Sequence, residues 1–227
     1  MGFMIGVIIQ ARMGSSRLPG KILKNIGNKS LLGHILSRLS RLKSEVCVVI
    51  ATSIATQDDE VEKFCKKSGV KCFRGSELNV LQRYYLCAKE NNFSHIIRLT
   101  GDNPFIDTNE LDNLIYLHIS QDADYSRSFN ALPKGVGAEI FTFKALELSY
   151  KFGDKENHKE HVNEYIEENE DKFKIAQLEV VGEKNRPDIS LTVDTQEDYK
   201  KACFIVENSK SGYISTEEAI KLCLQYV

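Results

Sequence analysis

Short apolar runs and helical stripes of apolar residues alternate along this chain. Unbroken apolar runs at 5–9 and 46–51 predict strands that are buried on both faces. Between them, leucine and isoleucine recur at helical spacing over 31–42, and Ser30 stands where a helix cap is expected. Alternation of strands and helices is typical of a mostly parallel sheet that is covered by helices. The pattern therefore predicts an α/β fold.

The alternation continues to the end of the chain. It predicts further helices at 56–68, before Asn91, after Asp107, over 162–170, after 194 and over 216–226. It predicts further strands at 70–73, at 95–99, after the glycines at 135–137 and up to 194. At 227 residues the chain is long enough to enclose a substantial core, and we expect a single domain over residues 1–227.

Composition narrows the class of protein. Hydrophobic residues make up 42% and charged residues 27% of the chain, and the formal net charge is -2. These values are ordinary for a soluble globular protein and lack the basic excess of a nucleic-acid-binding domain. The six cysteines include no C-x-x-C pair, which favours free thiols over a zinc site or a disulfide framework. Because no apolar stretch is long enough to span a membrane, we expect a cytoplasmic protein that acts on small molecules.

The segment 10–23, Q-A-R-M-G-S-S-R-L-P-G-K-I-L, directly follows the first buried strand. Its glycines, serines and proline disfavour regular structure and leave backbone N–H groups available. It also carries Arg12, Arg17 and Lys21, whose like charges repel one another unless an anion lies among them. The spacing of its glycines and the residue after Lys21 differ from those of a Walker A loop. The segment is therefore not a Walker A loop. We predict that it binds a polyphosphate, and the alternative is a solvated basic turn.

Two aspartates follow predicted strands that are far apart in the sequence. Asp102 lies in T-G-D-N-P, just after the strand at 95–99, and Asp194 lies in V-D-T-Q-E-D-Y. A carboxylate at the carboxyl end of a strand is well placed to hold a divalent cation. Each aspartate also has a simpler explanation, since Asp102 suits an Asn-Pro turn and Asp194 suits a helix cap. Two carboxylates that converge on one site would be a stronger signal than either alone.

These motifs resemble those of the sugar-activating cytidylyltransferases, which include the synthetases of CMP-3-deoxy-manno-octulosonate and CMP-acylneuraminate. The resemblance is greatest to the spore-coat-polysaccharide branch, and an R-G-(x)n-V-L-x-R pattern that begins at Arg74 adds to it. It implies a three-layer Rossmann-like nucleotide-binding domain of the nucleotide-diphospho-sugar transferase type, with a mostly parallel central sheet. It also implies Mg²⁺-dependent transfer of CMP from CTP to an acidic sugar or phosphorylated small molecule, with release of pyrophosphate, for surface polysaccharide biosynthesis.

The resemblance implies roles for individual residues as well. Those implied to contact the nucleotide are Ala11, Arg12, Gly14, Ser15, Arg17, Lys21, Arg74, Gly101 and Asp102. Those implied to act in catalysis are Arg12, Lys21, Asp102 and Asp194. The two aspartates are implied to hold Mg²⁺, and the residues implied to contact the acceptor are Gly137, Glu139 and His161. Thr100 and Asn103 replace the Gln and Glu that the octulosonate synthetases usually carry, which argues against octulosonate as the acceptor.

The resemblance further implies a homodimer, with a dimerisation and acceptor subregion at about 125–165. Two other classes of protein compete with this interpretation. Asp122 and Asp124 form a D-x-D pair, which would hold the metal in a GT-A-type glycosyltransferase that uses a nucleotide sugar. A catalytically silent regulator would instead bind CTP with Mg²⁺ and turn over no acceptor.

Overall fold

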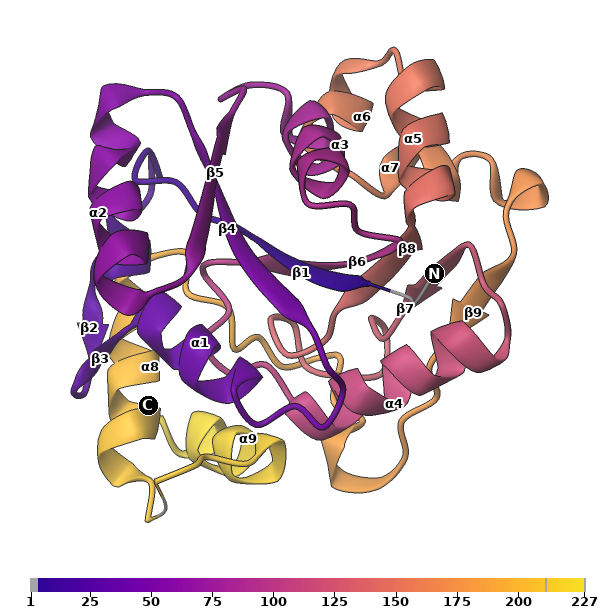
Figure 1. Cartoon of the computed structure of the whole chain (residues 1–227). Helices are drawn as coiled ribbons and strands as arrows, with labels where there is room; N and C mark the ends of the chain where they lie inside the picture. The colour runs from indigo at the N-terminus through magenta and orange to yellow at the C-terminus, as the bar shows by residue number, and fades with distance from the viewer. Residues whose placement is uncertain (1–3, 211, 227) are drawn as a thin grey trace.

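A computed structural model describes residues 4–210 and 212–226. Within these ranges seven strands form one sheet in the order β5-β4-β1-β6-β8-β7-β9, and β2 and β3 form a short hairpin (Figure 1). The strands are β1 (Ile5–Gln10), β2 (Asn25–Ile26), β3 (Lys29–Ser30), β4 (Cys47–Ser53), β5 (Lys71–Gly75), β6 (His95–Thr100), β7 (Tyr125–Arg127), β8 (Glu139–Thr142) and β9 (Ile175–Gln177). Strands β5, β4, β1 and β6 run parallel, and β8 runs antiparallel to β6. The predicted α/β fold with a mostly parallel sheet is confirmed.

Helices cover both faces of this sheet. They are α1 (Leu31–Leu39), α2 (Asp59–Ser68), α3 (Val80–Glu90), α4 (Thr108–Ser120), α5 (Phe143–Phe152), α6 (Glu156–Glu160), α7 (Glu164–Glu167), α8 (Gln196–Asn208) and α9 (Thr216–Gln225). Single 3-10 turns lie at Lys21–Leu23, Thr56–Asp58, Glu170–Lys172 and Gly182–Lys184. No helix in the described parts of the chain combines the length and the apolar character that crossing a membrane requires.

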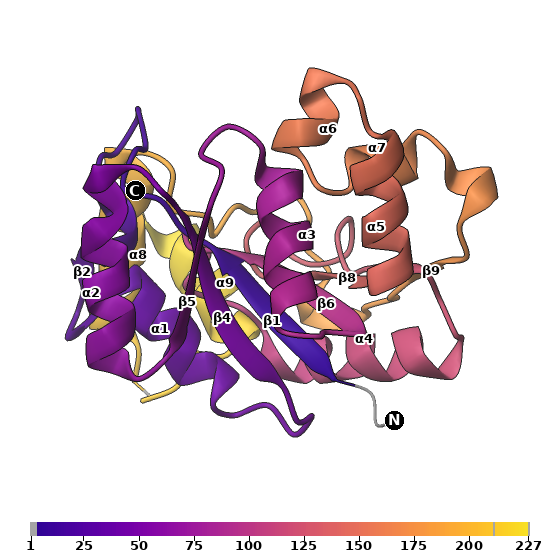
Figure 2. The same ribbon diagram turned by 45° about the horizontal axis from the view of Figure 1, so that its top comes forward.

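The three layers explain why β1 contains no polar residue before its last position. Val7 and Ile9 point to one face, where α1, α2 and α4 pack on the sheet. Ile8 points to the other face, which α3, α5 and α7 cover (Figure 2). A strand that is enclosed on both sides needs apolar side chains at every position. Helices α8 and α9 form a third apolar cluster with residues of α1 and of the segment that follows β6.

Local signals in the sequence set the ends of several helices as predicted. Ser30 caps α1, and its hydroxyl oxygen accepts a hydrogen bond of 3.1 Å from the N–H of Gly33. Asp107 caps α4 by accepting from the N–H groups of Asn109 and Glu110, each at 3.0 Å. Gly69 ends α2 with a φ of 67°, a left-handed conformation that glycine adopts without steric cost. Caps of this kind each contribute about 1 kcal/mol to helix stability.

The helix predicted over 162–170 is wrong, because the structure has only the four-residue helix α7 there. Glutamates in this segment lie three and four positions apart, and like charges at that spacing destabilise a helix. The carboxylate of Glu168, just after α7, lies within hydrogen-bonding distance of Lys155 and His158. The segment is therefore not a continuous helix, and it is held by the buried side chains of Val162 and Ile166 together with ion pairs of its glutamates.

The strand predicted to end at Asp194 is also not a strand of the sheet. Ser190 makes only an isolated bridge with Lys134. The N–H of Leu191 donates to the carbonyl of Lys134 at 2.8 Å, and the N–H of Val193 donates to the carbonyl of Asp102 at 2.9 Å. These apolar residues are extended and buried as expected, but their backbone groups bond to two loops instead of a neighbouring strand. The segment thereby brings Asp194 close to Asp102.

A buried pair of histidines lies under β6 and β7, on the face covered by α4. His118 is almost fully buried; its Nδ1 lies 2.8 Å from the hydroxyl of Ser126, and its Nε2 lies 3.0 Å from Nδ1 of His95. Burial, followed by the effect of His95, lowers the pKa of His118 to about 4, while nearby Asp124 opposes the shift. Folding therefore favours the neutral imidazole.

We predict that acid destabilises the protein through His118 before its carboxylates titrate. The folded-state pKa lies below the unfolded value, so the unfolded chain binds the proton more readily and stability falls as pH drops from about 6.5 toward 4. Between pH 7 and pH 5 the contribution of His118 to the unfolding free energy should fall by about 2 kcal/mol. Urea unfolding of the wild type and of His118→Gln, which retains a hydrogen-bonding side chain, measures this. An equal loss in both proteins would contradict the assignment.

Candidate active site

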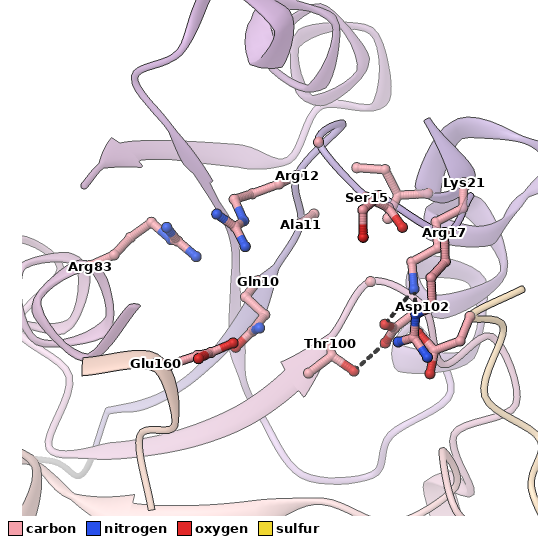
Figure 3. Close-up of a pocket in the computed structure, with 15 residues that line it drawn as sticks. Gln10, Ala11, Arg12, Ser15, Arg17, Lys21, Arg83, Thr100, Asp102 and Glu160 are labelled. Carbon is pink, nitrogen blue, oxygen red and sulfur yellow. Dashed lines mark hydrogen bonds and ion pairs between the residues drawn. The ribbon is translucent and has the colours of Figure 1, made fainter. Parts of the chain in front are cut away.

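A cavity of about 370 Å³ opens at the carboxyl ends of β1 and β6 (Figure 3). The two strands end side by side, with Gln10 paired to Thr100 in the register of the sheet. The loop after β1 and the T-G-D-N-P segment after β6 therefore emerge at one edge. The residues that line the cavity are Gln10, Ala11, Arg12, Gly14, Ser15, Ser16, Arg17, Lys21, Ile22, Arg83, Thr100, Gly101, Asp102, Glu160 and Asp194. All the predicted nucleotide contacts except Arg74 lie among them.

The loop after β1 is held in shape by a buried carboxylate. Asp58 accepts hydrogen bonds from the N–H of Met13 at 2.7 Å and from the N–H of Ser53 at 3.2 Å, and it also accepts one from the Ser53 hydroxyl. Within the loop, the N–H of Gly20 donates to the carbonyl of Met13 at 3.0 Å. Gly20 has a φ of 68°, which a residue with a side chain would adopt only with strain. The loop is therefore shaped by the protein before any ligand enters.

Three charged side chains meet on one side of the cavity. Nζ of Lys21 lies 2.8 Å from Oδ2 of Asp102 and 2.8 Å from Oδ1 of Asp194. The lysine side chain is buried, whereas the two carboxylates are partly exposed to the cavity. Arg17 adds a second cation, with Nη2 at 3.0 Å from Oδ1 of Asp194. The convergence of the two aspartates that the sequence analysis anticipated is present in the structure.

Asp194 is not the cap of α8. That position belongs to Thr195, whose hydroxyl oxygen accepts from the N–H of Asp198 at 3.2 Å, while the Asp198 carboxylate accepts from the N–H of Thr195 at 3.0 Å. This reciprocal capping box begins the helix and leaves the side chain of Asp194 free to face Lys21. The simpler explanation of Asp194 as a helix cap is therefore wrong.

The carboxylate pair fits the known preferences of magnesium. Both aspartates place an oxygen within hydrogen-bonding distance of one ammonium group, so the space between them already accommodates a positive charge. Among the described residues, no three His, Cys, Asp or Glu side chains form a metal-binding group. Mg²⁺ is commonly held by one or two carboxylates together with substrate phosphates and water. The donor set therefore suits a metal that arrives with a phosphorylated substrate better than a permanently bound structural metal.

The opposite side of the cavity holds polar groups that the sequence analysis did not assign to the site. Arg83, on α3, is fully buried, and its Nε and Nη2 have no hydrogen-bond partner among the described residues. Oε1 of Gln10 is likewise unpaired within that part of the chain. Burial, and to a lesser extent the positive charge of Arg12, lowers the pKa of Arg83 to about 10. Glu160, at the end of α6, brings a negative charge to the same side (Figure 3).

The sequence motifs included or bordered these cavity residues, but they did not identify them as site residues. Arg83 is the final residue of the V-L-x-R pattern, so the motif contained the cavity arginine although Arg74 was the one assigned. Glu160 directly precedes His161, which was assigned to the acceptor. Gln10 is the first residue of the segment 10–23 that carries the family resemblance, although no role was assigned to it.

Arg74 does not line the cavity. Its Nη1 forms ion pairs of 2.7 Å with Asp59 and with Glu62 on α2. Its Nε and Nη2 donate to the carbonyls of Ser53 and Ala55, each at 3.0 Å. The guanidinium thus joins β5 to the start of α2. This geometry gives no support to the predicted contact between Arg74 and the nucleotide.

The three residues assigned to the acceptor are not brought together at the cavity. Glu139 is fully buried in β8, where it pairs with Arg98 at 2.6 Å and accepts a hydrogen bond from the hydroxyl of Tyr125. Gly137 faces Ser128, whose oxygen would lie 2.7 Å from an added Cβ. His161 is exposed at the end of α6 and lies outside the cavity lining, although Glu160 beside it is part of that lining. The geometry supports none of these three contacts.

The D-x-D pair lies at the other edge of the sheet. The carbonyl of Asp124 accepts from the N–H of Thr142, and Thr142 pairs with His95 at the start of β6. Asp102 follows the end of that same strand. The carboxylate of Asp124 accepts from the N–H of Lys174 at 3.0 Å, so it has a structural role there. The glycosyltransferase alternative, which required this pair at the nucleotide, is not favoured.

Residues 6–223 match the family model described as cytidylyltransferase, and the chain belongs to that family. The spore coat polysaccharide biosynthesis protein SpsF of Bacillus subtilis (strain 168) is 40% identical over 198 residues, which are 85% of this chain and 82% of that protein. A cytidylyltransferase structure from Leptospira borgpetersenii serovar Hardjo-bovis (strain JB197) has a TM-score of 0.91 at 35% identity and covers 99% of this chain and 95% of its own. These matches confirm the predicted family and make the chain a nucleotidyltransferase.

A more distant structure supports the fold alone. The structure of CMP:2-keto-3-deoxy-manno-octonic acid synthetase in complex with CTP has a TM-score of 0.68 at 18% identity, and it covers 90% of this chain and 98% of its own. The predicted Rossmann-like architecture of nucleotidyltransferases is therefore confirmed.

We predict that Asp58→Ala destabilises the protein by loosening the loop after β1. The change leaves the buried N–H groups of Met13 and Ser53 without their acceptor, and the unfolding free energy should fall by about 2 kcal/mol or more. Asp58→Asn keeps the size of the side chain and one acceptor oxygen, so it should lose less. Urea unfolding followed by circular dichroism compares the two variants. An alanine variant as stable as the wild type would show that the loop does not depend on Asp58.

Proposed function

We propose that this protein transfers CMP from CTP to a small acidic acceptor and releases pyrophosphate. The observation that carries the proposal is the meeting of Asp102 and Asp194 at Lys21, beside a preformed loop that bears Arg12 and Arg17. Cations and loop N–H groups around the cavity suit the phosphates of a nucleotide. Paired carboxylates suit the metal that accompanies those phosphates.

The proposed roles follow from this placement. Arg12, Arg17 and Lys21, with the backbone of Gly14 and Ser15, would hold the phosphates of CTP and stabilise the departing pyrophosphate. Asp102 and Asp194 would hold Mg²⁺, which when bound offsets negative charge on the reacting phosphate and lowers the pKa of a coordinated oxygen. Nucleotidyl transfer of this kind depends on positioning and charge stabilisation, so no side-chain nucleophile is required.

The acceptor would enter on the side of Arg83 and Glu160. The unpaired donors of Arg83 suit a carboxylate or phosphate on a small acceptor, or a polar edge of the nucleotide itself. The name of the Bacillus subtilis relative supports an activated sugar for surface polysaccharide as the product. We also propose that the protein is cytoplasmic, as its composition predicts, and that it forms a homodimer through about 125–165, as the family resemblance implies.

Pyrophosphate release tests this function directly. Each of the four nucleoside triphosphates is incubated with Mg²⁺ and a panel of ulosonic acids and phosphorylated small molecules, and we expect release from CTP with one class of acceptor. Asp102→Ala and Asp194→Ala should remain folded and lower the rate at least about 100-fold, because the metal ion supplies several kcal/mol of charge stabilisation. Undiminished release by either variant would defeat the metal assignment. Binding of CTP with no release for any acceptor would favour the silent regulator.

A charge-matched pair of variants tests the proposed contact between Arg17 and the phosphates of CTP. Arg17→Gln removes a cavity cation and should weaken CTP binding about tenfold, the value of one hydrogen bond to a charged group. Lys24→Gln removes the same charge from an exposed residue that lies outside the cavity lining and faces the ring of Tyr199. This control should bind CTP within twofold of the wild type. Isothermal titration calorimetry measures both affinities, and equal effects of the two changes would mean that only net charge matters.

A further inference from the structure

Four side chains from two distant segments form one continuous chain of hydrogen bonds that ends on Asp102. The hydroxyl of Thr192 lies 2.9 Å from Oδ1 of Asn103. Nδ2 of Asn103 lies 2.7 Å from Oγ1 of Thr100, and Oγ1 of Thr100 lies 2.6 Å from Oδ1 of Asp102. Thr100 and Asp102 also line the cavity (Figure 3). Asn103 and Thr192 lie behind them and outside the cavity lining.

The chemistry of the groups sets the direction of this chain. An ionised carboxylate can only accept, so Thr100 donates its single hydroxyl proton to Asp102. The oxygen of Thr100 must then accept, and only the NH₂ group of Asn103 can donate to it. This orients the amide and leaves its carbonyl oxygen to accept from Thr192. Each of the three hydrogen bonds therefore runs in the same direction, with the donors in order from Thr192 to Asp102.

The hydrogen bond from Thr100 gives the two carboxylate oxygens of Asp102 different partners. Oδ1 accepts from Thr100, whereas Oδ2 lies 2.8 Å from Nζ of Lys21 and faces the space shared with Asp194. Without the hydroxyl of Thr100, the carboxylate could turn about its last bond to intermediate angles at which neither oxygen points directly to that space. The chain thus holds Asp102 in one orientation.

The fold makes room for this chain at Gly135. That residue has a φ of 86°, and a Cβ placed there would lie 2.6 Å from the hydroxyl oxygen of Thr192 and 2.9 Å from Oδ1 of Asn103. Two backbone bonds, from Leu191 to Lys134 and from Val193 to Asp102, flank Thr192 and hold it in register. The chain of hydrogen bonds therefore connects the two segments that carry the converging aspartates.

We propose that Thr100 is a positioning residue for the metal-binding carboxylate of Asp102, with Asn103 and Thr192 supporting it from behind. This inference rests on the proposed function, because it presumes that Asp102 and Asp194 hold the metal. Groups that orient a metal-binding side chain in this way commonly change metal affinity or activity 10- to 100-fold when they are removed. The distinguishing property is that Thr100 acts through Asp102 and not through the nucleotide.

The test uses Thr100→Val, which has nearly the same shape and lacks the hydroxyl. Binding of Mn²⁺ to the full-length protein with CTP and no acceptor is measured by electron paramagnetic resonance, and kcat and the KM for CTP are measured with Mg²⁺. We expect Mn²⁺ affinity and kcat at limiting Mg²⁺ to fall about 10- to 100-fold while the KM for CTP changes less than about threefold. Thr100→Ser restores the hydroxyl and should bring both quantities back to within about threefold of the wild type.

Thr52→Val is the matched control. Thr52 is buried in β4, which β1 separates from β6 in the sheet, and its hydroxyl has no hydrogen-bond partner among the described residues. The same substitution there should leave Mn²⁺ affinity and kcat at the wild-type level. If Thr100→Val behaves like Thr52→Val, or if Thr100→Ser is as impaired as Thr100→Val, the positioning role is overturned.

Asp102→Ala, measured in parallel, distinguishes failure of the metal assignment from failure of the role proposed for Thr100. Loss of Mn²⁺ binding in Asp102→Ala with wild-type binding in Thr100→Val would leave the proposed function standing and reject only the role of Thr100. Wild-type Mn²⁺ binding in Asp102→Ala would reject the metal assignment, and the role of Thr100 would fall with it. Loss in both variants, with rescue by Thr100→Ser, supports both.

Discussion

The cavity depends on one arrangement of charge, the ammonium of Lys21 held between the carboxylates of Asp102 and Asp194. Two carboxylates at about 4 Å would repel each other by about 4 kcal/mol at an effective dielectric constant of 20. The lysine removes this repulsion and allows segments 92 positions apart to meet. The same arrangement holds a cation between the two carboxylates that are proposed to bind the metal.

Much of the fold could be predicted because residues close together in the sequence determine where its strands and helices begin and end. The apolar run of β1, the cap at Ser30 and the terminating Gly69 each have a physical meaning within a few residues. Where the structure differs, the deciding contacts are distant in sequence. The segment before Asp194 has the composition of a strand, yet its backbone groups bond to Lys134 and Asp102.

The site was predictable to the extent that it follows from the edge of a parallel sheet. Loops after β1 and β6 must meet there, so the cationic loop and Asp102 could be placed together. The positions of Arg74 and Glu139 could not be predicted from the sheet edge, because each side chain is held by an oppositely charged residue elsewhere in the fold. Arg74 is taken by two carboxylates of α2, and Glu139 is enclosed with Arg98. A charged residue read alone does not reveal whether its counter-charge is a ligand or a neighbour.

The unpaired donors of Arg83 have a consequence for selectivity. A buried donor that a bound molecule leaves without an acceptor costs about 1–3 kcal/mol. A molecule that presents acceptors to Arg83 would avoid this cost, and one of the same shape without acceptors would incur it. Selection beside Arg83 would therefore act more strictly on hydrogen-bonding groups than on apolar bulk.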